Sequence, residues 1–327
     1  MRRRDFIAGL GGAAVAGPRG AWGQPAAMPV VGFLGAQDAA GWNSYVAAFR
    51  DGLADAGFED GRNVKIEFRW ADGQANRLPA LASDLVHAQA SVIVPSVGSA
   101  AIRAARSASP TIPIVFVLGG DPVKLGLVSS LNRPDGNMTG VSFQLNILTA
   151  KRIALLHELV PRAAAIGLLV NPDNPNAEAD ANAALEAAKQ FGQQVHVLNV
   201  NSERDFDSAF ASFSQRQVGG LFVASDSLFV GQRDRLVALA AKHSLPTIYD
   251  RREITDAGGL VSYGASFADA HRQAGIHVGR ILKGTLTSDL PVFQATKFQL
   301  VINLKTAKAL NLAISATMLA LADDVIE

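Results

Sequence analysis

Hydrophobic residues in the first part of the chain fall into short continuous runs that alternate with stretches of helical spacing. Three of the runs are almost wholly apolar, which predicts strands buried on both faces, as in parallel sheets. A fourth, at 64–70, alternates apolar with charged residues and predicts a half-exposed strand. The predicted strands are 30–34, 64–70, 91–95 and 112–118, and the predicted helices lie around 46–53, 78–86 and 96–106. Strands that alternate with helices in this way predict a doubly wound parallel α/β sheet.

The same alternation then starts again, which predicts a second lobe of similar construction. Its predicted strands are 166–170, 195–200, 221–224 and 247–249, and its predicted helices lie around 153–160, 177–191, 206–213 and 236–243. The tail adds a strand at 260–263, a helix at 267–282, a strand at 298–304 and a mostly helical end over 306–327. We predict an N-terminal lobe of 24–141 plus about 265–292, and a C-terminal lobe of 142–264 plus about 293–327. A tail that returns between the lobes predicts a hinge of more than one strand.

The stretch 112–142 joins the two halves of this pattern. Its buried strand ends at Gly119-Gly120, where glycine turns without steric cost. Asp121 and Pro122 then suit the N-cap and the first position of a helix. The polar region 132–140 follows, and we expect the first crossing between the lobes there.

Composition and charge describe an exported globular chain. Hydrophobic residues make up 49% of it and charged residues 18%, and there is no cysteine for a disulfide, a thiolate metal site or a nucleophile. The first 23 residues contain a basic N-terminal region with Arg2-Arg3, then a short apolar run, and then small residues that suit a cleavage site. This order predicts a twin-arginine secretion signal. Its removal changes the formal net charge from +1 to −2, because it holds four arginines and one aspartate. Nothing in that charge predicts binding to nucleic acid or to an anionic membrane.

Polar and glycine-rich turns follow several predicted strands, and in open α/β sheets ligands bind at such turns. Ser96, Gly98 and Ser99 at a helix start offer hydroxyl and backbone N–H groups to a carboxylate, aided by the helix dipole. Ser96 or Ser99 could equally serve only as the N-cap of that helix. Asp226, between two serines in a turn, is favoured as the partner of a ligand ammonium group.

Other residues at these turns are weaker candidates. Asp121 could also meet an ammonium group, although it suits the N-cap before Pro122 equally well. Three aromatic residues, Trp42, Tyr249 and Tyr263, could stack on a planar ligand, and each could instead be ordinary core packing. The remaining candidates are Gln37, Asp38, Gly120 and Ser227.

No catalytic or cofactor motif accompanies these turns. The six histidines show neither HExxH nor paired-ligand spacing, and no GxSxG elbow, Walker A sequence or GxGxxG after a strand occurs. The glycine cluster at 9–12 belongs to the predicted signal, and no pair of carboxylates has a spacing that fixes a glycosidase site. The sequence therefore predicts a binding protein without cofactor or metal.

Four stretches carry a resemblance to a known family. They are VVGFLGAQD at 30–38, GDPVKLGLVSSLNRPDGNMTGVS at 120–142, DAGGLVSYG at 256–264 and FQLVINLKTAKALNL at 298–312. They resemble the periplasmic substrate-binding proteins of ABC transporters, in the family of tryptophan-type aromatic amino-acid binders. The resemblance implies the type I periplasmic-binding fold, with two Rossmann-like lobes, three crossovers and a ligand between them. The chain departs from the family at Gly119-Gly120 and at Arg252-Glu253, both at expected pocket walls.

Three functions remain open at this stage. The first is an exported, monomeric solute-binding protein that closes on an amino acid or another small carboxylate and delivers it to an ABC permease. The second is a periplasmic sensing module that presents its ligand state to a signalling receptor. The third is an exported α/β enzyme such as a racemase or hydrolase. The first is favoured, because the resemblance covers nearly the whole chain.

Overall fold

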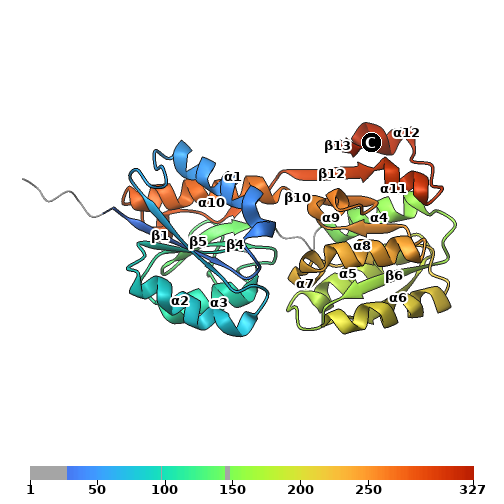
Figure 1. The fold of residues 1–327 in the computed structure, drawn as a ribbon, viewed down its shortest axis with the longest axis horizontal. Coiled ribbons are helices and arrows are strands. Elements are labelled where there is room, and N and C mark those ends of the chain that lie inside the picture. Colours follow the sequence, from blue (N-terminus) through green and yellow to red (C-terminus); the bar gives the residue numbers. More distant parts are fainter. Residues whose placement is uncertain (1–27, 97, 144–147) are drawn as a thin grey trace, which may run out of the picture.

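The computed structural model describes residues 28–96, 98–143 and 148–327, which form two α/β lobes side by side (Figure 1). The predicted secretion signal at 1–23 lies outside the described residues. Each lobe is a twisted sheet with helices on both faces, as the continuous apolar strands require. The predicted α/β class with two parallel-dominated sheets is confirmed.

The first lobe contains a six-stranded parallel sheet in the order β11-β5-β4-β3-β1-β2. Its strands are β1 (Val30–Gly35), β2 (Lys65–Trp70), β3 (Val92–Ser96), β4 (Ile114–Leu118), β5 (Met138–Ser142) and β11 (Phe293–Gln294). One face packs on α1 (Asn43–Asp55) and α10 (Phe267–Leu282), and the other on α2 (Leu78–His87) and α3 (Ser99–Ala108). Short 3-10 helices lie at Ala40–Trp42, Ala75–Arg77 and Thr287–Asp289.

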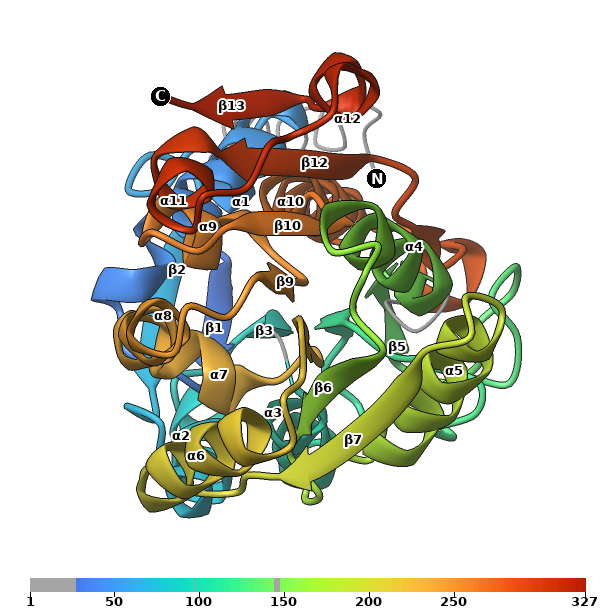
Figure 2. The ribbon, with the colours of Figure 1, turned by 90° about the vertical axis from the view of Figure 1, so that its right-hand side faces the viewer.

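The second lobe contains a seven-stranded sheet in the order β13-β12-β10-β9-β8-β6-β7, in which only the β10–β12 pair is antiparallel. Its strands are β6 (Ala165–Val170), β7 (Gln194–Asn199), β8 (Leu221–Val223), β9 (Thr247–Tyr249), β10 (Val261–Ala265), β12 (Phe298–Asn303) and β13 (Asp324–Ile326). One face carries α4 (Thr149–Leu159), α5 (Ala177–Lys189), α11 (Leu304–Ala309) and α12 (Ala316–Leu321). The other carries α6 (Phe206–Gln215), α7 (Ser227–Gly231), α8 (Arg233–Lys242), α9 (Arg252–Asp256) and the 3-10 helix Glu203–Asp205. Figure 2 looks onto this lobe.

The two sheets repeat one strand order, β2-β1-β3-β4-β5 in the first lobe and β7-β6-β8-β9-β10 in the second. In such doubly wound sheets the ligand crevice lies beyond the carboxyl ends of the strands. Helix α10 completes the first lobe although it follows the second in sequence, and it lies beside α1 (Figure 1). Glycine permits this close approach, because a Cβ atom on Gly52 would lie 1.9 Å from the Arg272 carbonyl oxygen.

The described chain passes between the lobes twice in its tail, from β10 to α10 and from β11 to β12. These two passages pair with each other, because the Ser266 N–H donates to the Lys297 carbonyl at 2.9 Å. The register continues into the antiparallel β10–β12 ladder, where Ala265 lies opposite Phe298. The hinge is therefore built from paired strands rather than from a single flexible linker.

Three predictions about local structure are wrong. The helix expected from Asp121 is one turn only, since Leu125 N–H bonds to the Asp121 carbonyl and Gly126 then adopts a φ of +64°. The crossing expected at 132–140 does not occur there, because β5 lies in the first sheet beside β4. The end of the chain is not continuously helical: Asp323 exchanges hydrogen bonds with Leu300, and β13 follows as an added strand.

Candidate functional site

A cleft of about 230 Å³ lies between the lobes and is lined by residues of both. The first-lobe wall is formed mainly by small and apolar side chains: Ala36, Gln37, Gly73, Ala75, Leu78, Gly98, Ser99, Ala100, Arg103, Leu118, Gly119 and Phe267. The second-lobe wall is polar and carries three carboxylates: Asn171, Asp173, Asn174, Pro175, Asn176, Asp180, Ser225, Asp226, Ser227 and Arg251. The volume suits a small molecule, and the unequal walls suit one with both apolar and charged parts.

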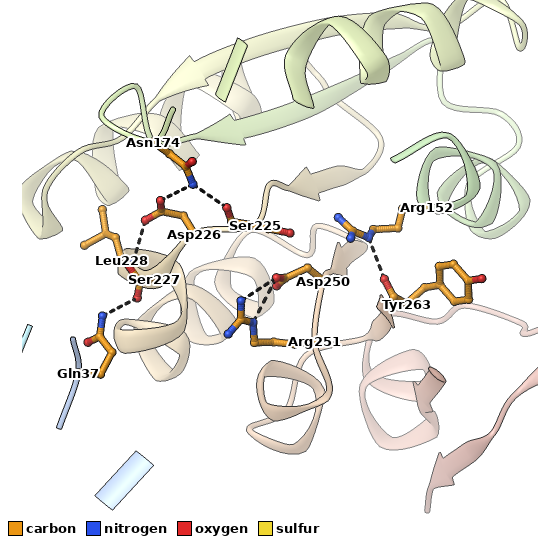
Figure 3. A network of polar contacts seen from close by, with 10 residues as sticks. All are labelled: Gln37, Arg152, Asn174, Ser225, Asp226, Ser227, Leu228, Asp250, Arg251 and Tyr263. Atoms are coloured by element: carbon orange, nitrogen blue, oxygen red, sulfur yellow. Dashed lines mark hydrogen bonds and ion pairs between the residues drawn. The ribbon is translucent and has the colours of Figure 1, made fainter. Parts of the chain in front are cut away.

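Asp226 is the centre of a hydrogen-bonded loop cluster on the second-lobe wall (Figure 3). As the N-cap of α7 its carboxylate accepts from the Leu228 N–H at 2.8 Å. It also accepts from Asn171 Nδ2 at 3.0 Å and from Asn174 Nδ2 at 2.8 Å. Asn174 Nδ2 donates in addition to the Ser225 carbonyl at 2.9 Å. These bonds tie the turn after β6 to the turn after β8 and hold both against the cleft.

A buried ion pair lies at the point where the second lobe meets the first. Arg251 Nε and Nη2 donate to one Asp250 oxygen at 3.1 and 3.0 Å, and both side chains are almost fully buried (Figure 3). The Arg251 guanidinium carbon lies 4.1 Å from the centre of the Phe267 ring, which belongs to the first lobe. Burial by itself lowers the pKa of Arg251, but the charge of Asp250, the hydrogen bonds to it and the nearby Tyr45 and Glu253 together outweigh burial, and the pKa is raised. This arginine therefore stays charged and contacts both lobes.

Asp180 is the most perturbed acid in the cleft. It lies in the first turn of α5 with 6% of its surface exposed. Burial raises its pKa to about 6; Arg152, which is also buried, opposes this shift and Asp250 adds to it. Arg152 Nε donates to the Tyr263 carbonyl at 2.8 Å (Figure 3). Sequence reasoning missed Asp180, because its neighbours read as an ordinary exposed helix start.

Five of the predicted site residues line the cleft: Gln37, Gly98, Ser99, Asp226 and Ser227. Gly98 has a φ of +116° and directly precedes α3, so the N-terminus of this ten-residue helix faces the cleft. Gln37 Nε2 donates to the Ser227 carbonyl at 3.4 Å and so links the two lobes (Figure 3).

Three other predicted polar residues and Gly120 have hydrogen-bond partners within the first lobe and are not among the lining residues. Asp38 accepts from the Gly41 N–H at 2.9 Å, and Asp121 accepts from the Val123 N–H at 2.9 Å. Ser96 is fully buried, with its hydroxyl 2.7 Å from His271 Nε2. Gly120 lies beside the cleft, where a Cβ atom would come 3.1 Å from Asn176 Oδ1 of the other lobe.

None of the three predicted stacking residues lines the cleft. Trp42 packs in the core of the first lobe, with its ring centre 4.9 Å from that of Tyr45. Tyr249 is fully buried in the core of the second lobe. Tyr263 packs against Phe298 in the paired strands of the hinge. These three side chains pack within the protein, and of the described aromatic residues Phe267 lines the cleft instead.

Residues 28–96, 98–143 and 148–327 contain neither a cluster of metal-binding side chains nor a helix suited to span a membrane. In this part of the chain, no group of three or more histidine, cysteine, aspartate or glutamate side chains is arranged to hold a metal ion. None of its helices combines the length and the apolar composition that a bilayer crossing requires.

Comparison with known proteins relates this architecture to one family. The family model described as "ABC transporter substrate binding protein" matches residues 38–326. The tyrosine-binding protein of Clostridioides difficile strain R20291 is 28% identical over 264 residues, which is 81% of this chain and 75% of that protein.

Solved structures show the same fold. The ABC domain from Streptococcus pneumonia in complex with L-Trp is 24% identical, with a TM-score of 0.83 over 91% of this chain and 99% of that one. The ligand-free, open structure of a substrate-binding protein with adhesive properties from Clostridium difficile is 23% identical, with a TM-score of 0.69 and the same coverage. The predicted type I periplasmic-binding fold is confirmed by this likeness. With a family model that spans nearly its whole length, the chain belongs to the ABC transporter substrate-binding protein family.

Proposed function

We propose that this chain is an exported solute-binding protein that captures an amino acid between its lobes and delivers it to an ABC permease. The observation that carries the proposal is the pairing of opposite charges across one cleft. The N-terminus of α3 and Arg103 lie on the first-lobe wall, and three aspartates lie on the second. A free amino acid carries a carboxylate for the first wall and an ammonium group for the second.

The proposed binding-site residues are those predicted residues that line the cleft. Gly98 and Ser99 lie where the first backbone N–H groups of α3 can donate to a carboxylate. Gln37, Asp226 and Ser227 lie at the opposite edge, where the lobes already share a hydrogen bond. A relative that is named for tyrosine binding and a solved neighbour with L-Trp support the amino-acid class.

Hinge closure supplies the binding mechanism. A ligand that touches both walls binds the closed arrangement better than the open one, and this difference in affinity shifts the population towards closure. Export through the predicted twin-arginine signal would deliver the protein to the periplasm, where it meets the permease as a monomer. Among the described residues that line the cleft, no nucleophile and base are in hydrogen-bond contact, and binding without turnover is the simpler chemistry.

A thermal-shift screen of the purified protein tests this proposal. The twenty proteinogenic amino acids form the test set, and neutral sugars of similar size form the control set. At a hundred times its Kd, a ligand of the folded state adds about 2.7 kcal/mol to the free energy of unfolding, so a true ligand raises the melting temperature clearly. Stabilisation by one or a few amino acids and by no sugar is expected. Stabilisation by sugars alone, or by neither set, overturns the proposal.

A further inference from the structure

Asp180 is a buried carboxylate of the cleft that accepts no hydrogen bond from the residues the structure describes. Asp180 lines the cleft with 6% of its surface exposed, yet no side-chain or backbone donor of the described residues bonds to its oxygens. The backbone N–H of Asp180 is engaged within α5, where it bonds to the Asn176 carbonyl at 2.9 Å. Burial of a carboxylate without a partner is costly, so a side chain in this position is retained only where something compensates it.

The surroundings of Asp180 compensate it in part only. The charged groups that act on it come from two elements, Arg152 from α4 and Asp250 from the end of β9. Arg152 attracts the carboxylate, whereas Asp250 repels it, and Asp250 is itself paired with Arg251. These two arginines and two aspartates balance in charge, but neither arginine hydrogen-bonds to Asp180, whose oxygens can therefore receive N–H donors from the cleft.

Asp226 is the other buried acid on this wall, and its carboxylate, unlike that of Asp180, is hydrogen-bonded to neighbouring loops. Its two oxygens accept three hydrogen bonds, one of which caps α7 and two of which fix the turn after β6. A carboxylate used in this way shapes the wall. Asp180 has no such bonds, and its oxygens are free to accept N–H donors from a ligand.

We infer that Asp180 receives the positively charged amino group of the ligand, and that Asp226 is a positioning residue that holds the wall around it. The inference rests on the proposed function and identifies the determinant that selects an amine. A ligand ammonium group that donates to Asp180 satisfies the buried charge when the lobes close. A ligand that has lost its amino group leaves Asp180 buried and unpaired, and the cleft therefore discriminates against it.

The test compares Asp180→Asn with the matched control Glu178→Gln, by isothermal titration at pH 7.5. Glu178 is exposed on the same helix and does not line the cleft. The probes are the amino acid that stabilises the wild-type protein most, its deaminated acid and putrescine. Loss of a charge-assisted hydrogen bond is expected to weaken amino-acid binding by roughly tenfold to 100-fold in Asp180→Asn. Glu178→Gln should bind within a factor of about two of the wild type, as surface changes usually do.

A second readout separates a ligand contact from a structural role. Asp180→Asn should bind the deaminated acid as well as the wild type does, and its amino-acid affinity should not change between pH 7.5 and pH 5. Wild-type affinity should fall over that range, because Asp180 takes up a proton. Equal affinity of both variants for the amino acid overturns the role of Asp180 and leaves the proposed function intact. Binding of putrescine, lost in Asp180→Asn, without binding of any amino acid supports Asp180 and overturns the amino-acid proposal. Binding of none of the probes overturns both.

Discussion

The free energy of unfolding of ligand-free Asp180→Asn, measured against pH, tests the electrostatics of the cleft most sharply. In the wild-type protein the carboxylate is buried, and its pKa is raised from 3.8 to about 6. The folded chain therefore holds this proton up to a higher pH than the unfolded chain does. The free energy of unfolding falls as the pH rises from about 4 to 6, and the loss is complete above that range.

The size of the effect follows from the shift itself. One pKa unit corresponds to 1.36 kcal/mol, so the ionised Asp180 lowers the free energy of unfolding by about 3 kcal/mol at neutral pH. An asparagine side chain has nearly the same shape as that of aspartate, but it does not ionise. Asp180→Asn should therefore match the wild type near pH 4 and exceed it by up to about 3 kcal/mol at pH 7.

Urea unfolding followed by far-ultraviolet circular dichroism measures this difference. Fluorescence is less suitable, because Trp42 and Trp70 both belong to the first lobe, whereas Asp180 belongs to the second. His271, whose pKa burial lowers to about 4, titrates in the opposite sense over this range. It is present in both proteins and cancels in the comparison. A stability difference that is constant from pH 4 to pH 7, or a less stable variant at pH 7, would refute the reasoning.

Three further substitutions test the frame around the cleft. Asp250→Asn leaves the buried Arg251 guanidinium without its counter-charge, and urea unfolding should show a loss of about 3–5 kcal/mol; an unchanged midpoint would contradict the ion pair. Asn174→Ala removes three side-chain hydrogen bonds, one of them to Asp226, and should lower stability by about 1–3 kcal/mol. Hydrogen exchange should then be faster in the turns after β6 and β8, and protection equal to the wild type would count against the cluster. Phe267→Leu keeps an apolar side chain but removes the ring under Arg251, and a loss of about 1 kcal/mol is expected in the melting experiment; no loss means that the stack contributes nothing.

Much of the fold could be predicted, because a strand covered on both faces must be apolar at every position. The strand β4 shows this directly: all five residues of Ile114–Leu118 are buried. The small strand β13 could not be predicted in this way. Its three residues pair with β12 across a long stretch of sequence, and the preceding apolar spacing suits a helix equally well.

The site was only partly predictable for a related reason. A turn after a strand can be recognised locally, and that rule predicts Asp226 and Ser99, which both line the cleft. Which side chain of a turn or helix start faces the opposite lobe depends on tertiary packing. Asp180 is buried because the first turn of α5 lies at the cleft. Trp42 does not line the cleft, because its side chain packs into the core of the first lobe.

The central claim is that the two lobes close on a small amine-bearing solute. The chain contains no cysteine, so Gln74→Cys and Glu178→Cys introduce one spin-label site on each lobe, both exposed and next to the cleft. Double electron–electron resonance then measures the distance between the labels with and without the amino acid that stabilises the protein most. The account predicts a shorter and narrower distance distribution at saturation. An identical distribution in both conditions would contradict it.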